Sequence, residues 1–569
     1  MDRTQMSPCQ QACPSNTDIP RYIRLILEGD LYGAWKINRV ANVFPSICGR
    51  VCTYACEVSC KRNCIRPRDG GQTVSTEPVS IRGLKRFITD NLPTDYVKMF
   101  LDETLPIKKN NKSVAVIGSG PAGLTVANDL ILAGCDVVVF EALPEPGGML
   151  RVGIPSYRLP TEIIEKEIDL LKKLGVTIGL NCALGKDVIL EDLRKDFDAV
   201  FLAIGAHRPK LMKVKGEYLE GIIPGITFLR RLNLGKAVEV KGKTIAVIGG
   251  GFTAADAARS AARLGAKPVV LYRRGKEEMP MDELEQLAMT KEHIPLHYLV
   301  APVEMISRDG KRVAKLKCVK MKLVEPDKRR SLKDRRRVPV PLEGSEFEIE
   351  ADIVIPAVAQ EPDLSVFPED FKIKPSDYST SMEGVFAGGD FLTGTTTHVI
   401  EVIGKAHEVS HEILRFLGQE PELPSQPQEL EQTDRSPWYF EDPERLHRKK
   451  VYGGWMDTLK GSFQEVEDGM DRELATLEAS RCLQCDFSIQ TRTDERCFRC
   501  GRCVESCLQG ALEIVRKEPL LGQRGTWFND GHWQTDETSR VVHNPELCVQ
   551  CGICTLVCPS ESLSFIGPK

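Results

Sequence analysis

Eight cysteines near the end of the chain constrain its fold more than any other feature. They form two runs of identical spacing, Cys-x2-Cys-x2-Cys-x3-Cys, and the second run is followed by Pro559. With this spacing, the first three thiolates of a run hold one [4Fe–4S] cube and the fourth crosses to the other cube. We therefore predict one cluster on Cys497, Cys500, Cys503 and Cys558, and another on Cys548, Cys551, Cys554 and Cys507. A pair of zinc sites is the alternative, but zinc sites seldom need this crossing pattern.

Length, charge and cysteine placement indicate a multidomain protein of a reducing compartment. The chain has 569 residues, enough for three or four domains. A net charge of −4 gives no electrostatic case for nucleic-acid binding, and no apolar run approaches the roughly 20 residues that span a bilayer. Most of the 20 cysteines lie in closely spaced runs, which favours metal ligation over disulfides. Because the start also lacks the apolar core of a signal peptide, we expect a cytoplasmic protein.

A first nucleotide-binding unit is predicted at residues 114–141. An apolar strand at 114–117 leads into a Gly-x-Gly-x-x-Gly loop, a helix at 124–132 and a second strand at 136–140. The glycines allow the backbone to approach a pyrophosphate, and an acid at the end of the second strand can accept a hydrogen bond from a ribose hydroxyl. A purely structural glycine turn is the alternative, but every part falls at the expected offset. The predicted FAD-binding residues here are Gly118, Gly120, Pro121, Ala122, Gly123 and Glu141.

A second unit follows at residues 244–274. Its strand at 244–248 leads into another glycine loop and an alanine-rich helix at 255–264, but its next strand, at 268–271, ends on Tyr272-Arg273-Arg274 rather than on an acid. Because arginine can pair with a 2′-phosphate that an acid would repel, we predict NADPH as the ligand. A solvated arginine pair is the alternative. The predicted NADPH-binding residues are Gly249, Gly251, Phe252, Thr253, Ala254, Arg273 and Arg274.

Two nucleotide units in one chain suggest a flavin and a nicotinamide held face to face. The return to the first unit is marked by a strand ending in Gly388-Gly389-Asp390, which places Gly389 and Asp390 near the flavin. A helix beginning near Thr396 or Thr397 can then point its N-terminus at the flavin ring. Hydride transfer depends on orientation, so we predict no catalytic acid–base dyad. No redox dithiol follows the first glycine loop, so a disulfide substrate is not expected.

Two longer motifs resemble those of the glutamate synthase small-subunit family. Residues 147–160 resemble its flavin-side motif, and residues 272–274 with 278–280 resemble its NADPH-side motif. The resemblance extends over residues 8–418. It implies FAD, NADPH and an N-terminal helical domain with two [4Fe–4S] clusters, and it assigns Gly148, Met149 and Arg158 to the flavin side.

The N-terminal cysteines resemble the family pattern, with one motif displaced. The family often places Arg-Cys-Leu-x-Cys just before the first cysteines, whereas here this motif stands far downstream, at residues 481–485. We hypothesise that it folds back to complete the first N-terminal cube. The ligands of that cube would be Cys9, Cys60, Cys482 and Cys485. A surface Cys-x2-Cys or a small separate site is the alternative.

The second N-terminal cube would use Cys13, Cys52 and Cys56. In relatives its fourth ligand is a Gln or Glu, at a position where this chain carries Lys85, which cannot ligate while protonated. Cys64 and Cys48 are the candidate substitutes; otherwise the cube is absent or has a non-protein ligand. The even spacing from Cys48 to Cys64 would put these cysteines on one helical stripe, but one stripe cannot surround a cube, so we expect a partly irregular segment.

These observations predict an α/β fold with two Rossmann-like nucleotide-binding domains, the NADPH domain being inserted in the FAD domain. An N-terminal helical iron–sulfur domain and a C-terminal ferredoxin-like α+β domain flank them. The expected bounds are 1–105 for the helical iron–sulfur domain, 110–215 and 375–418 for the FAD domain, 216–374 for the NAD(P)H domain, 419–475 for a linker, and 476–569 for the two-[4Fe–4S] ferredoxin domain. The basic run at 328–337 is expected to be a solvated hairpin loop.

The predicted function is electron transfer between NADPH, via FAD, and a partner protein or ferredoxin, through two C-terminal and one or two N-terminal clusters. The expected partner is a catalytic subunit of a multi-subunit complex; neither nucleic acid nor a membrane span is expected. The alternatives are a stand-alone flavin reductase of a small molecule and a wiring subunit with a vestigial nucleotide site. The direction of flow stays open, because cluster potentials span roughly −700 to +450 mV.

Overall fold

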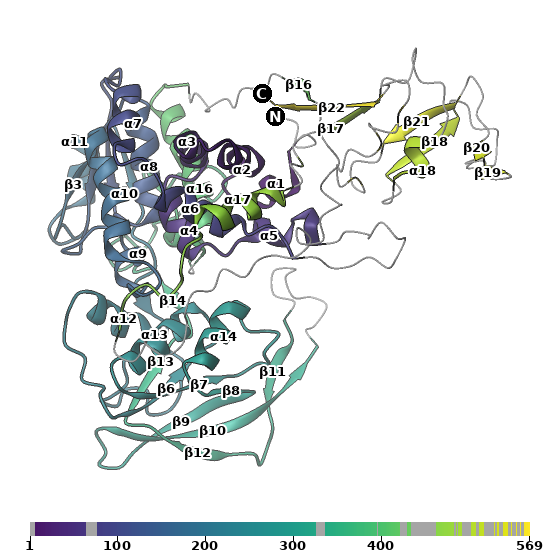
Figure 1. The fold of residues 1–569 in the computed structure, drawn as a ribbon. Coiled ribbons are helices and arrows are strands. Elements are labelled where there is room, and N and C mark those ends of the chain that lie inside the picture. Colours follow the sequence, from purple (N-terminus) through teal and green to yellow (C-terminus); the bar gives the residue numbers. More distant parts are fainter. Residues whose placement is uncertain are drawn as a thin grey trace.

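In the computed structural model, the N-terminal helices lie beside the first of two α/β units, the second α/β unit lies below, and further strands lie to one side (Figure 1). It describes residues 6–63, 77–325, 336–394, 397–420 and 462–482, together with Cys485 and short segments between 430 and 568. Helices and mainly parallel sheets alternate through the middle of the chain, as the predicted α/β class requires.

The N-terminal part is helical. Asp18 and Asp30 cap two of its helices, because their side chains accept hydrogen bonds from the first-turn N–H groups. Tyr22 and Leu84 share one hydrophobic core with Val116 of the neighbouring sheet, so these helices are packed firmly onto the first α/β unit. The elements are α1 (Pro8–Ala12), α2 (Ile19–Glu28), α3 (Leu31–Ala41), α4 (Pro45–Val51), α5 (Ala55–Val58), the 3₁₀ turn η2 (Lys61–Asn63), α6 (Ile81–Asp90) and α7 (Tyr96–Thr104).

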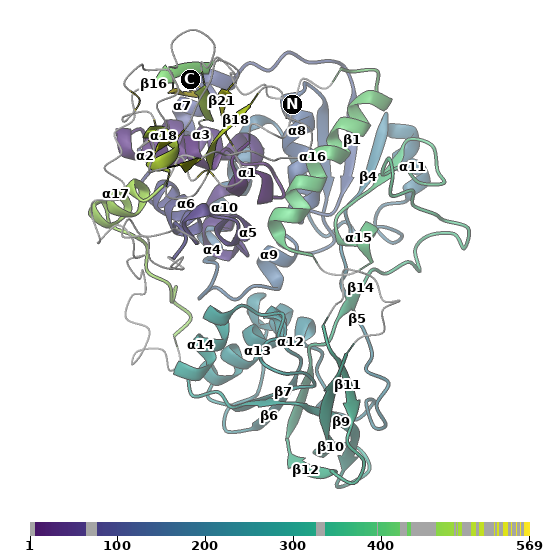
Figure 2. The same cartoon turned by 90° about the vertical axis from the view of Figure 1, so that its right-hand side faces the viewer.

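The first α/β unit is built on a five-stranded parallel sheet of order β15-β4-β1-β2-β3. Its central strands are continuous apolar runs because helices cover the sheet, and Figure 2 shows α16 beside α8. The strands are β1 (Ser113–Ile117), β2 (Asp136–Phe140), β3 (Thr177–Gly179), β4 (Ala199–Leu202) and β15 (Val385–Ala387). The helices are α8 (Pro121–Leu132), α9 (Met149–Val152), α10 (Thr161–Leu174), α11 (Leu190–Asp196), α15 (Asp390–Thr393) and α16 (Val399–Phe416).

The second α/β unit contains a four-stranded parallel sheet of order β13-β6-β7-β8 and an antiparallel sheet in which β10 pairs with β9, β11 and β12. Its strands are β6 (Thr244–Ile248), β7 (Lys267–Tyr272), β8 (Leu296–Tyr298), β9 (Val300–Ser307), β10 (Val313–Val324), β11 (Val338–Pro341), β12 (Phe347–Glu350) and β13 (Ile353–Pro356). Its helices are α12 (Gly225–Asn233), α13 (Phe252–Arg263) and α14 (Glu283–Lys291).

The chain crosses between the two units along a short ribbon. β5 (Arg208–Pro209) pairs antiparallel with β14 (Gln360–Glu361) where the chain leaves the first unit and returns to it. After β14, Phe367 is buried with Ala115 and Phe391 in the core of the first unit. The inserted unit therefore ends near β14, earlier than residue 374, because aromatic side chains of the returning segment complete the first core.

Residues 462–482 return to the N-terminal helices. Helix α17 (Arg472–Ser480) packs on α2 and α6, and its Ala475 and Ala479 are fully buried there. Part of the expected linker, 462–475, is thus packed structure. Further along lie α18 (Arg502–Glu505), a sheet of β16 (Leu430–Thr433), β22 (Leu563–Pro568) and β17 (Ser488–Thr491), and the pairs β18 (Leu512–Arg516) with β21 (Ser539–His543) and β19 (Phe528–Asn529) with β20 (His532–Trp533).

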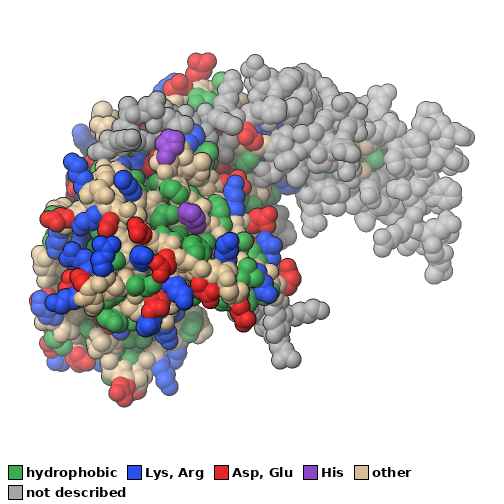
Figure 3. Space-filling view, turned by 90° about the horizontal axis from the view of Figure 1, so that it is seen from below, with side chains coloured by type: hydrophobic (Ala, Val, Ile, Leu, Met, Phe, Trp, Pro, Cys, Tyr) green, Lys and Arg blue, Asp and Glu red, His purple; other side chains and the backbone are tan. Residues whose placement is uncertain are grey.

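The surface carries both signs of charge. On the face shown in Figure 3, Lys and Arg side chains are interspersed with Asp and Glu rather than gathered in one basic patch. Within the described part of the chain, no helix is both long enough and apolar enough to cross a bilayer.

Candidate redox cofactor sites

The first glycine loop has the shape of a phosphate cradle. Gly118 has φ +106°, and a Cβ there would lie 2.4 Å from the carbonyl oxygen of Ala203. Gly148 closes on the same loop, since its Cβ would lie 2.8 Å from the Cα of Gly120. A Cβ on Gly120 would meet nothing within 4 Å, so the backbone is open on that side. Tight packing behind and open space in front fit a dinucleotide pyrophosphate.

Glu141 is buried and holds this loop. One of its carboxylate oxygens accepts from the N–H and the hydroxyl of Ser119, and the other accepts from the N–H of Leu143 at 2.8 Å. Ser119 Oγ in turn accepts from the N–H of Gly147 at 3.0 Å. Because carboxylate oxygens have further acceptor capacity, a ribose contact is compatible with this arrangement and stays a prediction.

The Gly-Gly-Asp segment lies against the start of α8. A Cβ on Gly389 would lie 2.9 Å from the Cβ of Ala122, so the structure brings these two predicted FAD residues together. Asp390 accepts from the N–H and the hydroxyl of Thr397, at 2.9 and 2.6 Å, and burial raises the pKa of Asp390. Helix α16 begins at Val399 with His398 as its N-cap, slightly later than predicted, and no side chain caps its first N–H groups.

The second glycine loop is shaped by Tyr272. A Cβ on Gly250 would lie 2.5 Å from the Tyr272 ring, whereas a Cβ on Gly251 would meet nothing within 4 Å. The Tyr272 hydroxyl donates to the carbonyl of Glu278 at 2.6 Å, and the N–H of Met281 donates to the carbonyl of Gly250 at 3.0 Å. Residues 272–281 therefore fold around the loop and leave one backbone face open for a ligand. Phe252, Thr253 and Ala254 form the first turn of α13 directly after it.

The two arginines that follow β7 lie in different environments. Arg273 is exposed, whereas Arg274 is buried and its Nε donates to the carbonyl of Arg337 at 3.0 Å. Arg337 Nε donates to Glu278 Oε1 at 2.6 Å. Of the basic run, Arg336 is exposed, and Arg337, whose side chain is 41% exposed, pairs with Glu278 beside the predicted NADPH site. Residues 326–335 lie outside the described residues, so the expected loop stays a prediction.

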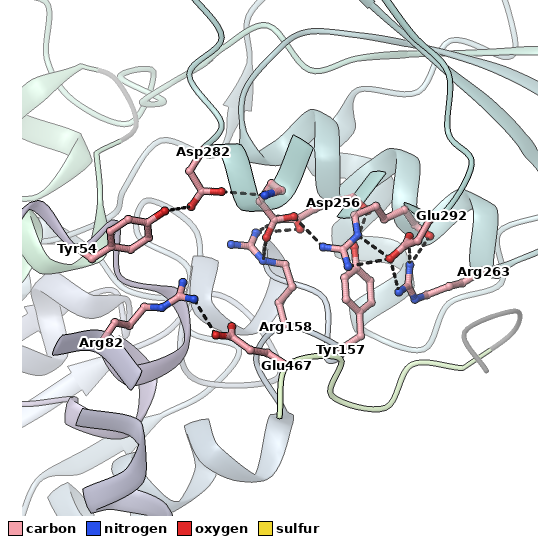
Figure 4. A network of polar contacts seen from close by, with 11 residues as sticks. Tyr54, Arg82, Tyr157, Arg158, Asp256, Arg263, Asp282, Glu292 and Glu467 are labelled. Atoms are coloured by element: carbon pink, nitrogen blue, oxygen red, sulfur yellow. Dashed lines mark hydrogen bonds and ion pairs between the residues drawn. The ribbon is translucent and has the colours of Figure 1, made fainter. Parts of the chain in front are cut away.

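The second α/β unit contacts the first unit through aromatic and ionic interactions, beginning at Phe252 after its glycine loop. The Phe252 ring lies edge-on to the His398 ring, with 6.2 Å between centroids. Arg158 stacks over Phe252 at 5.3 Å and forms ion pairs with Asp256 at 2.9 Å and with Glu285 at 3.0 Å (Figure 4). Arg158, which the resemblance assigned to the flavin side, therefore lies at the junction with the second unit, where the buried Asp256 and the half-buried Glu285 attract it. Met149 begins α9 just after Gly148.

Four of the predicted N-terminal ligands line one small pocket. They are Cys9, Cys60, Cys482 and Cys485, and the other lining residues are Pro8, Ile19, Pro20, Ile23, Lys61, Val79 and Ile81. Burial raises the pKa of the Cys9 thiol, and the neighbouring thiolates of Cys485, Cys482 and Cys60 raise it further. Mutual repulsion of this kind favours a cation or cluster among them, so the donor set fits an iron–sulfur cube.

Arg481 and Glu478 hold the returning cysteines in place. Glu478 is almost fully buried, accepts from the N–H of Ser80 at 2.6 Å and pairs with Arg481 at 2.6 Å. Arg62 Nε donates to the carbonyl of Arg481 at 2.7 Å. These bonds fix the end of α17 beside the N-terminal helices.

A second group of four cysteines surrounds Lys85. The thiols are Cys13, Cys48, Cys52 and Cys56. Burial alone would lower the pKa of Lys85, but the neighbouring thiolates raise it above its usual range. The group is compact because a Cβ on Gly49 of α4 would lie 2.9 Å from the Cα of Arg86 of α6. Of the two candidate substitutes, Cys48 lies in this group, and Cys64 lies outside the described residues.

The helix is interrupted between Cys52 and Cys56. We expected such an irregular segment because cysteines on one helical stripe could not surround a cube. Helix α4 ends at Val51, Cys52 is extended, and Tyr54 is left-handed with φ +44° before α5 begins. This turn lets thiols four residues apart face a common centre.

Cysteines of the C-terminal runs share one small core. Cys503, Cys548 and Cys554 are buried in it, and Cys507 and Cys558 pack against it. Cys507 Sγ accepts from the N–H of Ala511 at 3.2 Å. Cys497, Cys500 and Cys551 lie outside the described residues. Within the described part of the chain, no three Cys, His, Asp or Glu side chains converge on a single metal ion; a cube takes more widely spaced thiolates than one ion does.

Two contacts link the cysteine groups to their neighbours. A Cβ on Gly404 of α16 would lie 2.3 Å from the carbonyl oxygen of Pro14, so α16 touches the residue after Cys13. At the other end, Lys61 Nζ, next to Cys60, donates to the carbonyl of Cys548. Neither contact could be predicted from the sequence, because both depend on tertiary packing.

Three family models match separate parts of the chain. They are pyridine nucleotide-disulphide oxidoreductase over residues 112–409, dihydropyrimidine dehydrogenase domain II with a 4Fe-4S cluster over residues 3–96, and a 4Fe-4S dicluster domain over residues 496–562. The glutamate synthase [NADPH] small chain of Escherichia coli K12 is 31% identical over 435 residues, which cover 72% of this chain and 88% of that protein. The chain belongs to the glutamate synthase small-subunit family.

Two further relatives are subunits that are longer than this chain. The NADP(+)-dependent formate dehydrogenase subunit beta of Moorella thermoacetica is 38% identical over 518 residues, 84% of this chain and 70% of that protein. The NADPH-Fe(3+) oxidoreductase subunit beta of Geobacter sulfurreducens is 36% identical over 528 residues, 84% of this chain and 75% of that protein. The predicted family, with cluster domains at both ends of the oxidoreductase domain, is confirmed.

Proposed function

We propose that this member of the glutamate synthase small-subunit family is an electron-transfer subunit. It would move electrons between NADPH, via FAD, and a partner protein or ferredoxin. The observation that carries the proposal is the contact series from α16, through two four-cysteine groups, to Cys548 of the C-terminal core.

The nucleotide loops provide orientation. Phe252 at the second loop lies edge-on to His398 at the start of α16, which supports a nicotinamide bound close to the flavin. Bound FAD would supply the exchange between two-electron hydride chemistry and single electrons. The chain's own part is to hold both ligands in register and to present the uncapped N-terminus of α16 to negative charge.

The contacts order the cysteine groups. Cys13 adjoins Pro14, which touches α16, so its group lies against the flavin side. Cys9 stands one helical turn earlier on the same short helix, and its group includes Cys60, which adjoins Lys61. Lys61 contacts Cys548. The proposed order from flavin to exit is therefore the Cys13 group, the Cys9 group and then the C-terminal clusters.

A catalytic partner subunit is part of the proposal. The relatives named as formate dehydrogenase and NADPH-Fe(3+) oxidoreductase are both beta subunits, and the glutamate synthase relative is a small chain. We infer a stoichiometric partner in the native complex. Mass spectrometry of the anaerobically purified complex tests this: a partner enzyme is expected, whereas a lone chain carrying FAD and iron would favour a soluble ferredoxin as partner.

The electron route is tested with Cys482→Ser/Cys485→Ser in the full chain. NADPH should still bleach the flavin, but the iron of one cube should be missing and the C-terminal clusters should stay oxidised in freeze-quenched EPR spectra. Cys318→Ser is the control, since Cys318 is buried in β10, far from both groups in sequence and outside every predicted ligand set. Reduction of the C-terminal clusters at the wild-type rate would overturn the route, and failure of NADPH to bleach the wild-type flavin would overturn the function.

A further inference from the structure

We propose that Lys85 is a charge-compensating residue for the cluster on Cys13, Cys48, Cys52 and Cys56, and that it raises the reduction potential of that cluster. The inference rests on the proposed function for the presence of a cube. It goes beyond that function because it gives Cys48 the role of fourth ligand and gives Lys85 a role in tuning.

The surroundings of Lys85 are unusual for a lysine. Lys85 is 5% exposed on α6, between Leu84 and Phe87 of the hydrophobic core. The four thiols of this group face it, and Cys48 lies beside it because Gly49 of α4 packs on Arg86 of α6; among the described residues no carboxylate forms an ion pair with it. Nearby acids are occupied elsewhere: Glu57 accepts from the backbone N–H of Arg82 at 2.9 Å. A buried ammonium without a counter-charge is costly, so the cysteine group is its counter-charge.

Four thiols complete the ligand set of a cube, which leaves Lys85 outside the coordination sphere. An ammonium has three donors and no acceptor, so it cannot ligate iron while charged. It can donate to cluster or cysteine sulfur. A cube held by four thiolates is negatively charged and becomes more so when it accepts an electron. A fixed positive charge in a low-dielectric site therefore favours the reduced state.

The position of Lys85 indicates what its positive charge does for electron transfer. Cys13 adjoins the contact with α16, so this cluster is the one against the flavin side. One electron enters the cluster on reduction, and no proton transfer is required. A raised potential makes this cluster a ready acceptor for electrons that leave the flavin.

The test is a potentiometric EPR titration of the full holoenzyme with a chemical reductant. In Lys85→Leu, which removes the charge without adding the amide ligand that a glutamine would bring, we expect the ratio of reduced to oxidised cluster at a fixed potential to fall about tenfold or more, which is a shift of about 59 mV for one electron. Lys85→Arg should keep the wild-type midpoint. Lys98→Leu removes the same charge from an exposed site on α7 and should leave the midpoint unchanged.

Every outcome decides the proposal. A Lys85→Leu protein with full iron and the wild-type midpoint overturns it. If Lys85→Leu loses the cluster while Lys85→Arg retains it, charge compensation is supported; loss in both variants overturns it in favour of a steric role. Cys48→Ser should remove or change this cluster's EPR signal, and an unchanged signal overturns the ligand assignment. Because the titration needs no NADPH, its failure is distinguishable from failure of the proposed function.

Discussion

Arg273 and Arg274 are neighbours in sequence but have different tasks in the folded chain. Arg274 is buried and donates to the carbonyl of Arg337, so its guanidinium serves the packing around Glu278. Arg273 is exposed at the end of β7, beside the open loop. Since parallel strands present ligands at their carboxyl ends, Arg273 is the better placed of the two for a 2′-phosphate.

Arg273→Ala should therefore weaken NADPH binding about tenfold or more and change NADH binding little. The reason is that a hydrogen bond to a charged group contributes about 1.5–3 kcal/mol, and NADH lacks the 2′-phosphate. Dissociation constants for both nucleotides, measured anaerobically by calorimetry, check this. Arg312→Ala removes an exposed arginine of the same unit and should change neither constant. Equal losses for NADPH and NADH would contradict the assignment.

Some residues of the site could be predicted from the sequence, and others could not. The pattern of residues 481–485 was enough to suggest that Cys482 and Cys485 return to Cys9 and Cys60, and the structure brings all four to one pocket. The choice between Cys48 and Cys64 stayed open, because linear spacing does not say which thiol faces Lys85. Arg158 was assigned to the flavin side by resemblance, but its ion pairs with Asp256 and Glu285 depend on the packing of two domains.

At the scale of elements, α16 joins three parts of the molecule. Its His407 contacts Asp129 of α8 through Nδ1 at 2.7 Å and the carbonyl of Ala41 at the end of α3 through Nε2 at 3.2 Å. Burial alone would lower the pKa of His407, but Asp129 and the Ala41 carbonyl raise it. The pKa of Asp129 is lowered, since the attraction of His407 outweighs burial.

The sign of the pH dependence follows from these directions. His407 has a folded pKa above its unfolded value of about 6.5, so its contribution to stability is complete below that pH and is lost as pH rises through the folded pKa. Asp129 contributes above about pH 3.9 and loses its contribution as pH falls through its lowered folded pKa. Burial lowers the pKa of the neighbouring His411, which acts in the opposite direction and loses stability as pH falls below about 6.5.

We expect the melting temperature of the holoenzyme to fall between pH 6 and pH 9 more steeply than that of His407→Gln. Glutamine can keep a hydrogen bond but not the charge, so the difference between the two slopes isolates the ion pair. Scanning calorimetry under anaerobic conditions measures it. His297→Gln, an exposed histidine of β8, should keep the wild-type slope. Parallel curves for wild type and His407→Gln would show that the pair does not titrate in this range.

Elements with a strong local signal agree well with the sequence. The strand expected at 244–248 is β6, and the strand expected at 136–140 is β2, because apolar runs bounded by glycine leave few other conformations. The packed segment 462–470 had no such signal. Its acidic side chains pair with residues that are far away in sequence: Glu465 pairs with Arg50 at 2.8 Å and Glu467 pairs with Arg82 at 2.7 Å. An acidic stretch of this kind therefore looks like a linker in sequence, although its carboxylates pair with arginines that the fold largely buries.

At the scale of the whole molecule, the second α/β unit is held at several points (Figure 4). Tyr54, between two cluster cysteines, donates to Asp282 Oδ2 at 3.1 Å, and Tyr157 donates to the carbonyl of Asp256 at 3.3 Å. Arg263 also lies 3.9 Å from the centre of the Tyr157 ring. The orientation of the NADPH-side unit is therefore fixed by contacts with both the flavin side and the cluster helices.

Arg158→Met should disturb that orientation without emptying the cofactor sites. It leaves the buried Asp256 without its closest cation, which is costly. We expect flavin reduction at saturating NADPH to slow about tenfold or more in anaerobic stopped-flow measurements, with normal FAD and iron content. Adding Asp256→Asn removes the uncompensated charge and should restore part of the rate. An unchanged rate in Arg158→Met would mean that the junction does not position the nicotinamide.

The return of Cys482 and Cys485 to the N-terminal pocket also determines when the proposed cluster can be assembled during protein synthesis. Cys9 leaves the ribosome early, but two of its proposed co-ligands emerge only after both nucleotide-binding units have been made. At about 5–20 residues per second this interval lasts tens of seconds. During that time the ligand set around Cys9 and Cys60 is incomplete, and their thiols can be oxidised or can bind another metal. The iron–sulfur assembly machinery must therefore either insert this cluster after translation or protect the free thiols until Cys482 and Cys485 have been synthesised.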